Sequence, residues 1–73
     1  MRVLSYMDIA IQLESMDHAL TVPVVAKLLG FSRSALYEMV NDCRIPHHRI
    51  GSSIRFDPQE LADWWRGQLM LAA

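Results

Sequence analysis

Residues 20–56 of the chain read LTVPVVAKLLGFSRSALYEMVNDCRIPHHRIGSSIRF, and this stretch decides the fold that the sequence predicts. Its first part favours a short helix, because Thr21 can cap the start and Pro23 suits the first turn, where a missing N–H costs nothing. Apolar residues then recur at helical spacing until Gly30, a typical helix end. We therefore predict a first helix of about two turns.

A second helix is predicted directly after the turn. Ser32 can cap its start, and Leu36 and Val40 form an i, i+4 apolar seam that packs inward. The other faces carry polar and aromatic side chains that are free to contact a partner. Two helices joined by a short turn that contains Gly form a helix-turn-helix, whose second helix enters the major groove of DNA through its N-terminal residues.

A two-stranded ribbon follows the second helix. Gly51 and Ser52 suit a two-residue hairpin turn with a positive φ angle at its first position. By alternation we expect an inner face of Ile50, Ile54 and Phe56 and an outer face of Arg49, Ser53 and Arg55. The ribbon is either a wing over a DNA backbone or minor groove, or an ordinary solvated hairpin. The predicted fold is mostly α with a small β-hairpin, a winged helix-turn-helix.

The last helix has the clearest start signal in the chain. Asp57 is the predicted N-cap, Pro58 occupies the first helical position, and Glu60 lies at capping-box spacing from the cap. Trp64 and Trp65 supply much of the bulk of this helix. We expect one indole to close the core beneath the ribbon and its neighbour, about 100° further around the helix, to be partly exposed.

The runs LTVPVVAKLLGFSRSALYEMV and RIPHHRIGSSIRFDPQELADWW together resemble the excisionase family of small winged-helix DNA-binding domains, relatives of the MerR-type fold. The resemblance covers roughly residues 20–65 and lies in the order of the elements rather than in one short motif. It implies a cytoplasmic, non-enzymatic protein of a bacterium or phage that binds double-stranded DNA. Such domains serve as recombination directionality factors, as transcription regulators and as small phage proteins, so the biological role stays open.

The length and composition exclude several classes of protein, namely disulfide-stabilised and membrane-spanning ones. A chain of 73 residues is a small domain, which buries only about 60% of its unfolded surface. The single cysteine, Cys43, excludes an internal disulfide, and no apolar run approaches the roughly 18 residues of a membrane span. We expect no membrane association and no signal peptide, because the apolar start contains Asp8 and lacks a small-residue cleavage site.

Neither catalysis nor metal binding is expected. His47 and His48 are adjacent on a predicted strand, where side chains point to opposite faces, so they cannot easily chelate one ion together. No nucleophile, base and orienting group occur at a recognisable spacing. We therefore predict that the protein is not an enzyme and holds no cofactor.

Charge is distributed unevenly along the chain. Residues 21–56 carry five basic and two acidic residues, a net charge of +3, whereas residues 1–20 and 57–73 each carry a net charge of −2. This segregation is what a basic reading surface with acidic flanks would give. It permits DNA binding and predicts weak affinity for a single copy.

Two residues depart from the pattern of the resembling family. Glu38 stands where related domains often carry basic residues, and three interpretations are open: a surface role, a pair with Arg33 or Arg44, or acceptance from a cytosine amino group. Cys43 stands where relatives often have Gly. A non-Gly residue there adopts a strained left-handed conformation or reshapes the turn.

Residues 1–19 form an N-terminal extension to the predicted DNA-binding domain of residues 20–73. Polar residues fall at spacings of three and four among apolar ones, which predicts an amphipathic helix with a broad apolar side. These polar residues are Ser5, Asp8, Gln12 and Ser15. The helix either caps the small core, or mediates self-association or docking on a recombinase or another protein.

The sequence thus predicts a DNA-binding surface. On the second helix we expect base and phosphate contacts from Ser32, Arg33, Ser34, Tyr37 and Asn41. On the wing we expect backbone contacts from Arg49, Ser52, Ser53 and Arg55, with flanking phosphate contacts from Lys27 and Arg44. Several copies on neighbouring sites could bend DNA for excision by a site-specific recombinase.

Two other functions stay open at this point. One is a transcription regulator of a mobile element or phage, which the sequence alone cannot separate from an excisionase. The other is a protein-protein interaction module that acts through the apolar N-terminal helix, and Glu38, Asp42 and the acidic flanks favour it.

Overall fold

The computed structural model describes the backbone of residues 6–72 and the side chains of residues 8–70. Over this range the chain forms four helices and one two-stranded antiparallel sheet. In chain order these elements are α1 (Tyr6–Glu14), α2 (Val22–Leu29), α3 (Arg33–Asn41), β1 (His48–Ile50), β2 (Ser53–Arg55) and α4 (Pro58–Ala72). The fold is a winged helix-turn-helix, with α2 and α3 as the helix pair and β1–β2 as the wing, as the sequence predicts.

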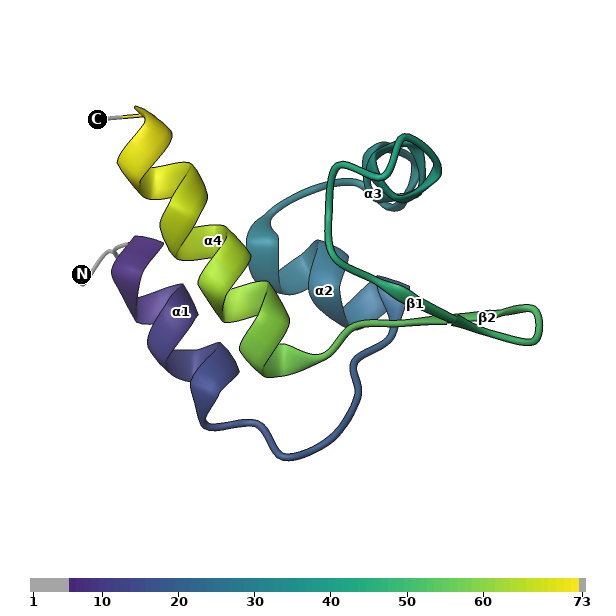
Figure 1. Cartoon of the computed structure of the whole chain (residues 1–73), viewed down its shortest axis with the longest axis horizontal. Helices are drawn as coiled ribbons and strands as arrows, with labels where there is room; N and C mark the ends of the chain where they lie inside the picture. The colour runs from purple at the N-terminus through teal and green to yellow at the C-terminus, as the bar shows by residue number, and fades with distance from the viewer. Residues whose placement is uncertain (1–5, 73) are drawn as a thin grey trace.

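The helices divide into two groups (Figure 1). The outer helices α1 and α4 lie side by side, and α2 packs against α3 on the other side of the molecule. The wing projects away from both groups, so its tip has no helix beneath it (Figure 1). None of the helices in residues 6–72 combines the length and the hydrophobicity of a membrane-spanning segment.

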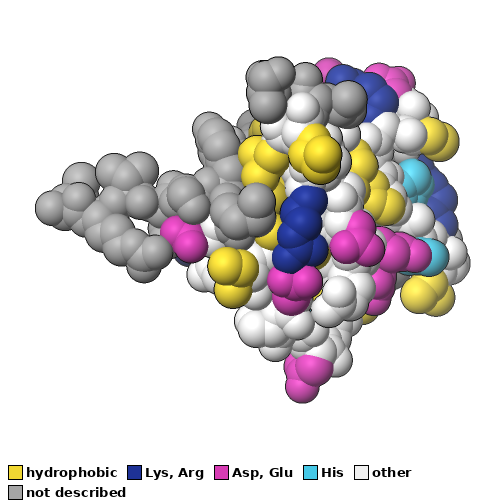
Figure 2. Space-filling model, turned by 60° about the vertical axis from the view of Figure 1, so that its left-hand side comes forward, with side chains coloured by type: hydrophobic (Ala, Val, Ile, Leu, Met, Phe, Trp, Pro, Cys, Tyr) yellow, Lys and Arg dark blue, Asp and Glu magenta, His cyan; other side chains and the backbone are white. Residues whose placement is uncertain are grey.

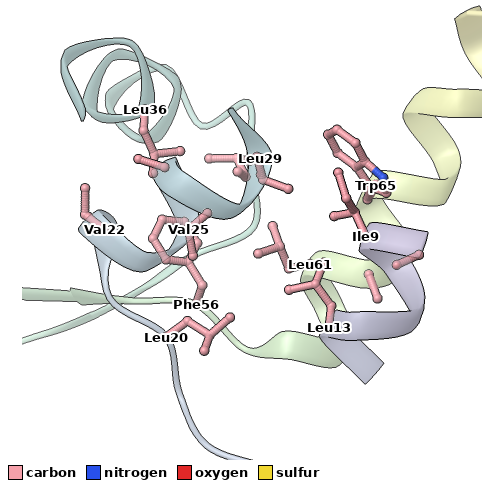
Figure 3. Close-up of a cluster of buried hydrophobic side chains, with 14 of the residues drawn as sticks. Ile9, Leu13, Leu20, Val22, Val25, Leu29, Leu36, Phe56, Leu61 and Trp65 are labelled. Atoms are coloured by element: carbon pink, nitrogen blue, oxygen red, sulfur yellow. The ribbon is translucent and has the colours of Figure 1, made fainter. Parts of the chain in front are cut away.

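One hydrophobic core joins the two groups. Phe56, Leu36 and Leu61 are fully buried, and side chains of α1, α2 and the Leu20 segment complete the cluster (Figure 3). From α1 the core receives Ile9, Ala10 and Leu13. Burial of this kind stabilises a fold by roughly 25 cal/mol per Å² of apolar surface.

Leu20 and Phe56 are paired through their backbones. The N–H of each donates to the carbonyl of the other at 2.9 Å, which adds a short antiparallel bridge at the outer edge of β2. The chain therefore enters α2 and leaves the wing at the same point.

The predicted helix starts are largely confirmed. The Ala35 N–H donates to Oγ of Ser32 at 3.1 Å, and the Glu60 N–H donates to Oδ2 of Asp57 at 3.0 Å. Thr21 occupies the N-cap position of α2, but its side chain makes no capping hydrogen bond, so the prediction that it caps the helix is wrong in its chemistry. Gly30 ends α2 with φ 79°, in the left-handed region that favours glycine.

The turn of the wing has the predicted form, with Gly51 at φ 64° as its first residue. Cys43, just after α3, also has a positive φ of 54°. The first of the two outcomes expected at this position is thus confirmed, and the chain keeps the turn at the cost of a left-handed cysteine.

The predicted faces of the wing are wrong. The register pairs Ile50 with Ser53 and Arg49 with Ile54, and directly paired residues lie on the same face of a ribbon. A two-residue turn therefore places Arg49 beside Ile54, whereas Ile50 shares its face with Ser53 and Arg55. Ile50 is 67% exposed, because the wing tip extends beyond the core.

The tryptophans of α4 also differ from expectation in one respect. Trp65 is buried, but it lies beside Ile9 at the α1 end of the core, while Phe56 fills the space beneath the wing (Figure 3). Trp64 is partly exposed, as predicted. The predicted N-terminal helix is present as α1; Ser5, the first residue of its expected polar stripe, lies outside the described residues.

Candidate nucleic-acid interface

One side of α3 is free of intramolecular packing. Leu36 and Val40 are buried against α2, so the residues about half a turn away face solvent. The predicted contact residues Ser34, Tyr37 and Asn41 lie on this exposed side. Ser32 and Arg33 lie four and three residues before Leu36, so they are on the side of the packed seam and are exposed because they stand at the N-terminal end of the helix. The structure therefore places three of the predicted residues on one side of α3 and two at its N-terminal end.

Ser32 has a structural role in addition to its predicted contact. Its Oγ accepts the capping hydrogen bond from Ala35, which leaves the hydroxyl proton available to a phosphate oxygen. Tyr37 is 46% exposed. Its ring can therefore pack against an apolar surface of a partner while its hydroxyl forms a hydrogen bond with a polar group there.

The wing is tied directly to α3. Nη2 of Arg49 donates to Oδ1 of Asn41 at 3.3 Å, and both side chains are exposed. Arg49 therefore lies on the side of the wing that faces α3. A partner that contacts α3 would meet this arginine at the same time.

The other predicted contact residues of the wing line a small hollow between the wing, α3 and the start of α2. The hollow has a volume of about 210 Å³, and Thr21, Tyr37, Ser53 and Arg55 are among its lining residues. Ser52 lines it as well. Arg55 is half-buried, and its Nη1 donates to the carbonyl of Ile54 at 2.8 Å, which holds the guanidinium along β2.

Lys27 and Arg33 line a second hollow, of about 410 Å³, between α2 and the beginning of α3. Both side chains are exposed, and neither forms a hydrogen bond or ion pair with any residue that the structure describes. Two unpaired cations at one hollow make a favourable place for a backbone phosphate.

Arg44 is arranged differently. Its Nη2 lies 3.4 Å from Oδ2 of Asp42, so its charge is partly neutralised at the end of α3. It lines neither of the two hollows. The interpretation that Glu38 pairs with Arg33 or Arg44 is wrong, because Glu38 forms no ion pair among the described residues.

The acidic residues lie mostly on the opposite part of the molecule. Figure 2 shows acidic side chains across the face that carries α1 and α4, interspersed with apolar and basic ones. Arg66, the basic residue of α4, pairs there with Glu14 of α1 and with Asp63 at 3.6 Å. Among the residues that the structure describes, the Lys and Arg side chains without an ion pair therefore lie on α2, on α3 and on the wing, namely Lys27, Arg33, Arg49 and Arg55.

Sequence reasoning missed one group of residues at this surface. Thr21, Val22 and Pro23 at the start of α2 line the same hollow as Tyr37 and the wing. The uncapped hydroxyl of Thr21 is free to donate to a phosphate oxygen, since it is not used to cap its own helix. The position of Thr21 before a predicted helix was visible in the sequence, but its proximity to the wing depends on the bridge between Leu20 and Phe56.

Comparison with known proteins supports a helix-turn-helix domain. A family model described as a helix-turn-helix domain matches residues 19–69, which include α2, α3, the wing and most of α4. No curated protein and no solved structure matches the chain.

Proposed function

Because the chain belongs to a family of helix-turn-helix domains, we propose that it is a sequence-specific DNA-binding protein of the excisionase type, a recombination directionality factor. Helix-turn-helix domains bind double-stranded DNA and act by binding rather than by catalysis. The excisionase assignment rests on the resemblance of residues 20–65 to that family and on the small winged architecture.

In the proposed mechanism α3 enters the major groove. Ser34, Tyr37 and Asn41 face the base edges there, because they lie away from the seam that packs against α2. Ser32 and Arg33, at the N-terminal end of the helix, contact the flanking backbone. This surface is the observation that carries the proposal.

Phosphate contacts hold the helix in register. Lys27 and Arg33 bind one phosphate at their shared hollow, and Arg44 adds a weaker contact because Asp42 competes for it. On the wing, Arg49 contacts the backbone beside α3, whereas Ser52, Ser53 and Arg55 contact it from the hollow near Tyr37. The two wing arginines lie on opposite faces and therefore hold two different phosphates.

Excision needs more than one bound copy in this proposal. A single domain offers few free cations, so several copies on neighbouring sites bind together and bend the DNA for a site-specific recombinase. We propose residues 20–73 as the DNA-binding domain of a bacterial or phage protein. Residues 1–19 form an extension that supplies Ile9, Ala10 and Leu13 to the core.

Three measurements test the proposal. Fluorescence anisotropy against fragments of the genomic neighbourhood, at two salt concentrations, should reveal salt-sensitive and sequence-selective binding. Gel shifts with the site placed at different positions along a fragment should reveal a bend. Adding the protein to a reaction with the neighbouring recombinase should raise excision; selective binding without any effect on excision would favour a transcription regulator.

A protein-interaction module is the second candidate, and one observation favours it. An apolar groove of about 410 Å³ runs between α1 and α2, with Ile9, Met16, Val24 and Leu28 among its lining residues. Binding through such a groove would respond little to salt, whereas DNA binding through about five phosphate contacts weakens steeply. Absence of DNA binding at low salt would therefore favour this candidate.

A further inference from the structure

Glu38 has an unusual position for a carboxylate on a DNA-binding surface. It lies two residues from the buried Leu36, about 200° around α3, so it is near the centre of the exposed face. It forms no ion pair among the described residues, whereas the neighbouring Asp42 is paired with Arg44. Its charge is therefore fully available to whatever α3 meets.

A free carboxylate at this place has an energetic consequence. When α3 docks, phosphates on both sides of the groove repel the carboxylate, and removing it from water leaves two acceptor oxygens without donors. The repulsion is offset only where a donor on a base edge meets the carboxylate. In the major groove the amino donors are N4 of cytosine and N6 of adenine. The adenine donor stands beside the acceptor N7, which repels a carboxylate, so cytosine is the base from which Glu and Asp accept.

The neighbours on α3 leave this role to Glu38. Asn41, one turn further along, already accepts from Arg49 through Oδ1, so its acceptor is partly committed. Ser34, one turn before, carries a short hydroxyl. Glu38 is thus the residue of this row with a long side chain and two uncommitted acceptor oxygens.

We infer that Glu38 determines base specificity by accepting a hydrogen bond from the exocyclic amino group of a cytosine in the major groove. The inference rests on the proposed DNA-binding function. It assigns the carboxylate two effects: it selects a C·G pair at one position of the site, and it weakens binding to all sequences that lack this donor. Because the carboxylate lowers the affinity for non-specific DNA, the difference in affinity between the preferred site and other sequences becomes larger.

The test compares base preferences of two variants with the full-length wild type. Each protein selects from a randomised DNA library, and the affinity for each single-base variant of the preferred site is then measured by anisotropy. Glu38→Gln removes the charge and keeps the length of the side chain. Asp63→Asn is the matched control, because it changes net charge equally on α4, away from α3.

For the wild type and Asp63→Asn we expect the same preference for C·G at one position, about tenfold over the other base pairs. Glu38→Gln keeps one acceptor oxygen and gains an NH₂ donor, so its preference at that position alone should shift from C·G towards A·T, and it should bind non-specific DNA more tightly than either protein. Unchanged preferences in Glu38→Gln, with selective binding intact, would overturn the inference and leave the proposed function standing. Absence of salt-sensitive binding by the wild type would overturn both.

Discussion

Nη2 of Arg49 on β1 lies 3.3 Å from Oδ1 of Asn41, the last residue of α3, and donates a hydrogen bond to it. This contact joins the wing to α3 at the edge of the proposed DNA surface. Both residues are exposed, so the bond contributes little to folding. In the proposed complex the bond preorganises the wing, because it holds the wing at a fixed angle to α3 in the free protein.

A double-mutant cycle tests that arrangement. Asn41→Ala and Arg49→Ala should each weaken DNA binding, and the double variant should lose less than the two single losses together, with a coupling of about 0.5–1 kcal/mol. Anisotropy on one target fragment gives all four affinities. Strictly additive losses would mean that the two residues contact DNA independently.

Arg33 should act through charge. Because Arg33 is exposed and unpaired, Arg33→Ala should weaken binding to every sequence and reduce the slope of log affinity against log salt by about one. Arg66→Gln is the control. Arg66 is paired with Glu14 and Asp63 on the face of α1 and α4, so its substitution should leave the salt slope unchanged. An unaltered slope in Arg33→Ala would exclude it from the phosphate contacts.

The two candidate N-caps should differ in stability. Ser32→Ala removes the acceptor of the Ala35 N–H and should lower the free energy of unfolding by about 1 kcal/mol. Thr21→Ala removes no capping bond and should have a much smaller effect. Urea unfolding followed by circular dichroism measures both, and equal losses would contradict the assigned roles.

Cys43 is a position where a substitution should stabilise the protein. Its φ of 54° costs a non-Gly residue about 1–2 kcal/mol, so Cys43→Gly should raise the free energy of unfolding by about 1 kcal/mol after the entropy cost of glycine. Asp42→Gly serves as the comparison, because Asp42 has an ordinary φ of −86°, so that glycine there brings its entropy cost without relief of strain and also removes the exposed pair with Arg44. Urea denaturation of the two variants should therefore shift in opposite directions.

The sequence predicted the parts of the fold that depend on local chemistry. Helix ends at Gly30 and Asp57 and the turn at Gly51 follow from backbone preferences of single residues, and each is confirmed. The spacing of Leu36 and Val40 predicted which side of α3 is buried, and hence which residues are exposed.

The parts that sequence reasoning missed depend on pairing across the chain. The faces of the wing follow from strand register. Across a two-residue turn each even-numbered residue of β1 is paired with an odd-numbered residue of β2, so Ile50 lies on the same face as Ser53. The choice of Asp42 over Glu38 as the partner of Arg44 depends on side-chain geometry after α3 has ended. The place of Trp65 depends on α1, whose docking no local motif specifies.

The mutual hydrogen bonds between Leu20 and Phe56 also have a mechanical consequence. They bring the two ends of residues 20–56 together, so the helix pair and the wing form a closed loop whose entry and exit are adjacent. The residue after β2 is bonded to a residue just before α2, so a displacement at the base of the wing is transmitted directly to the start of the helix pair.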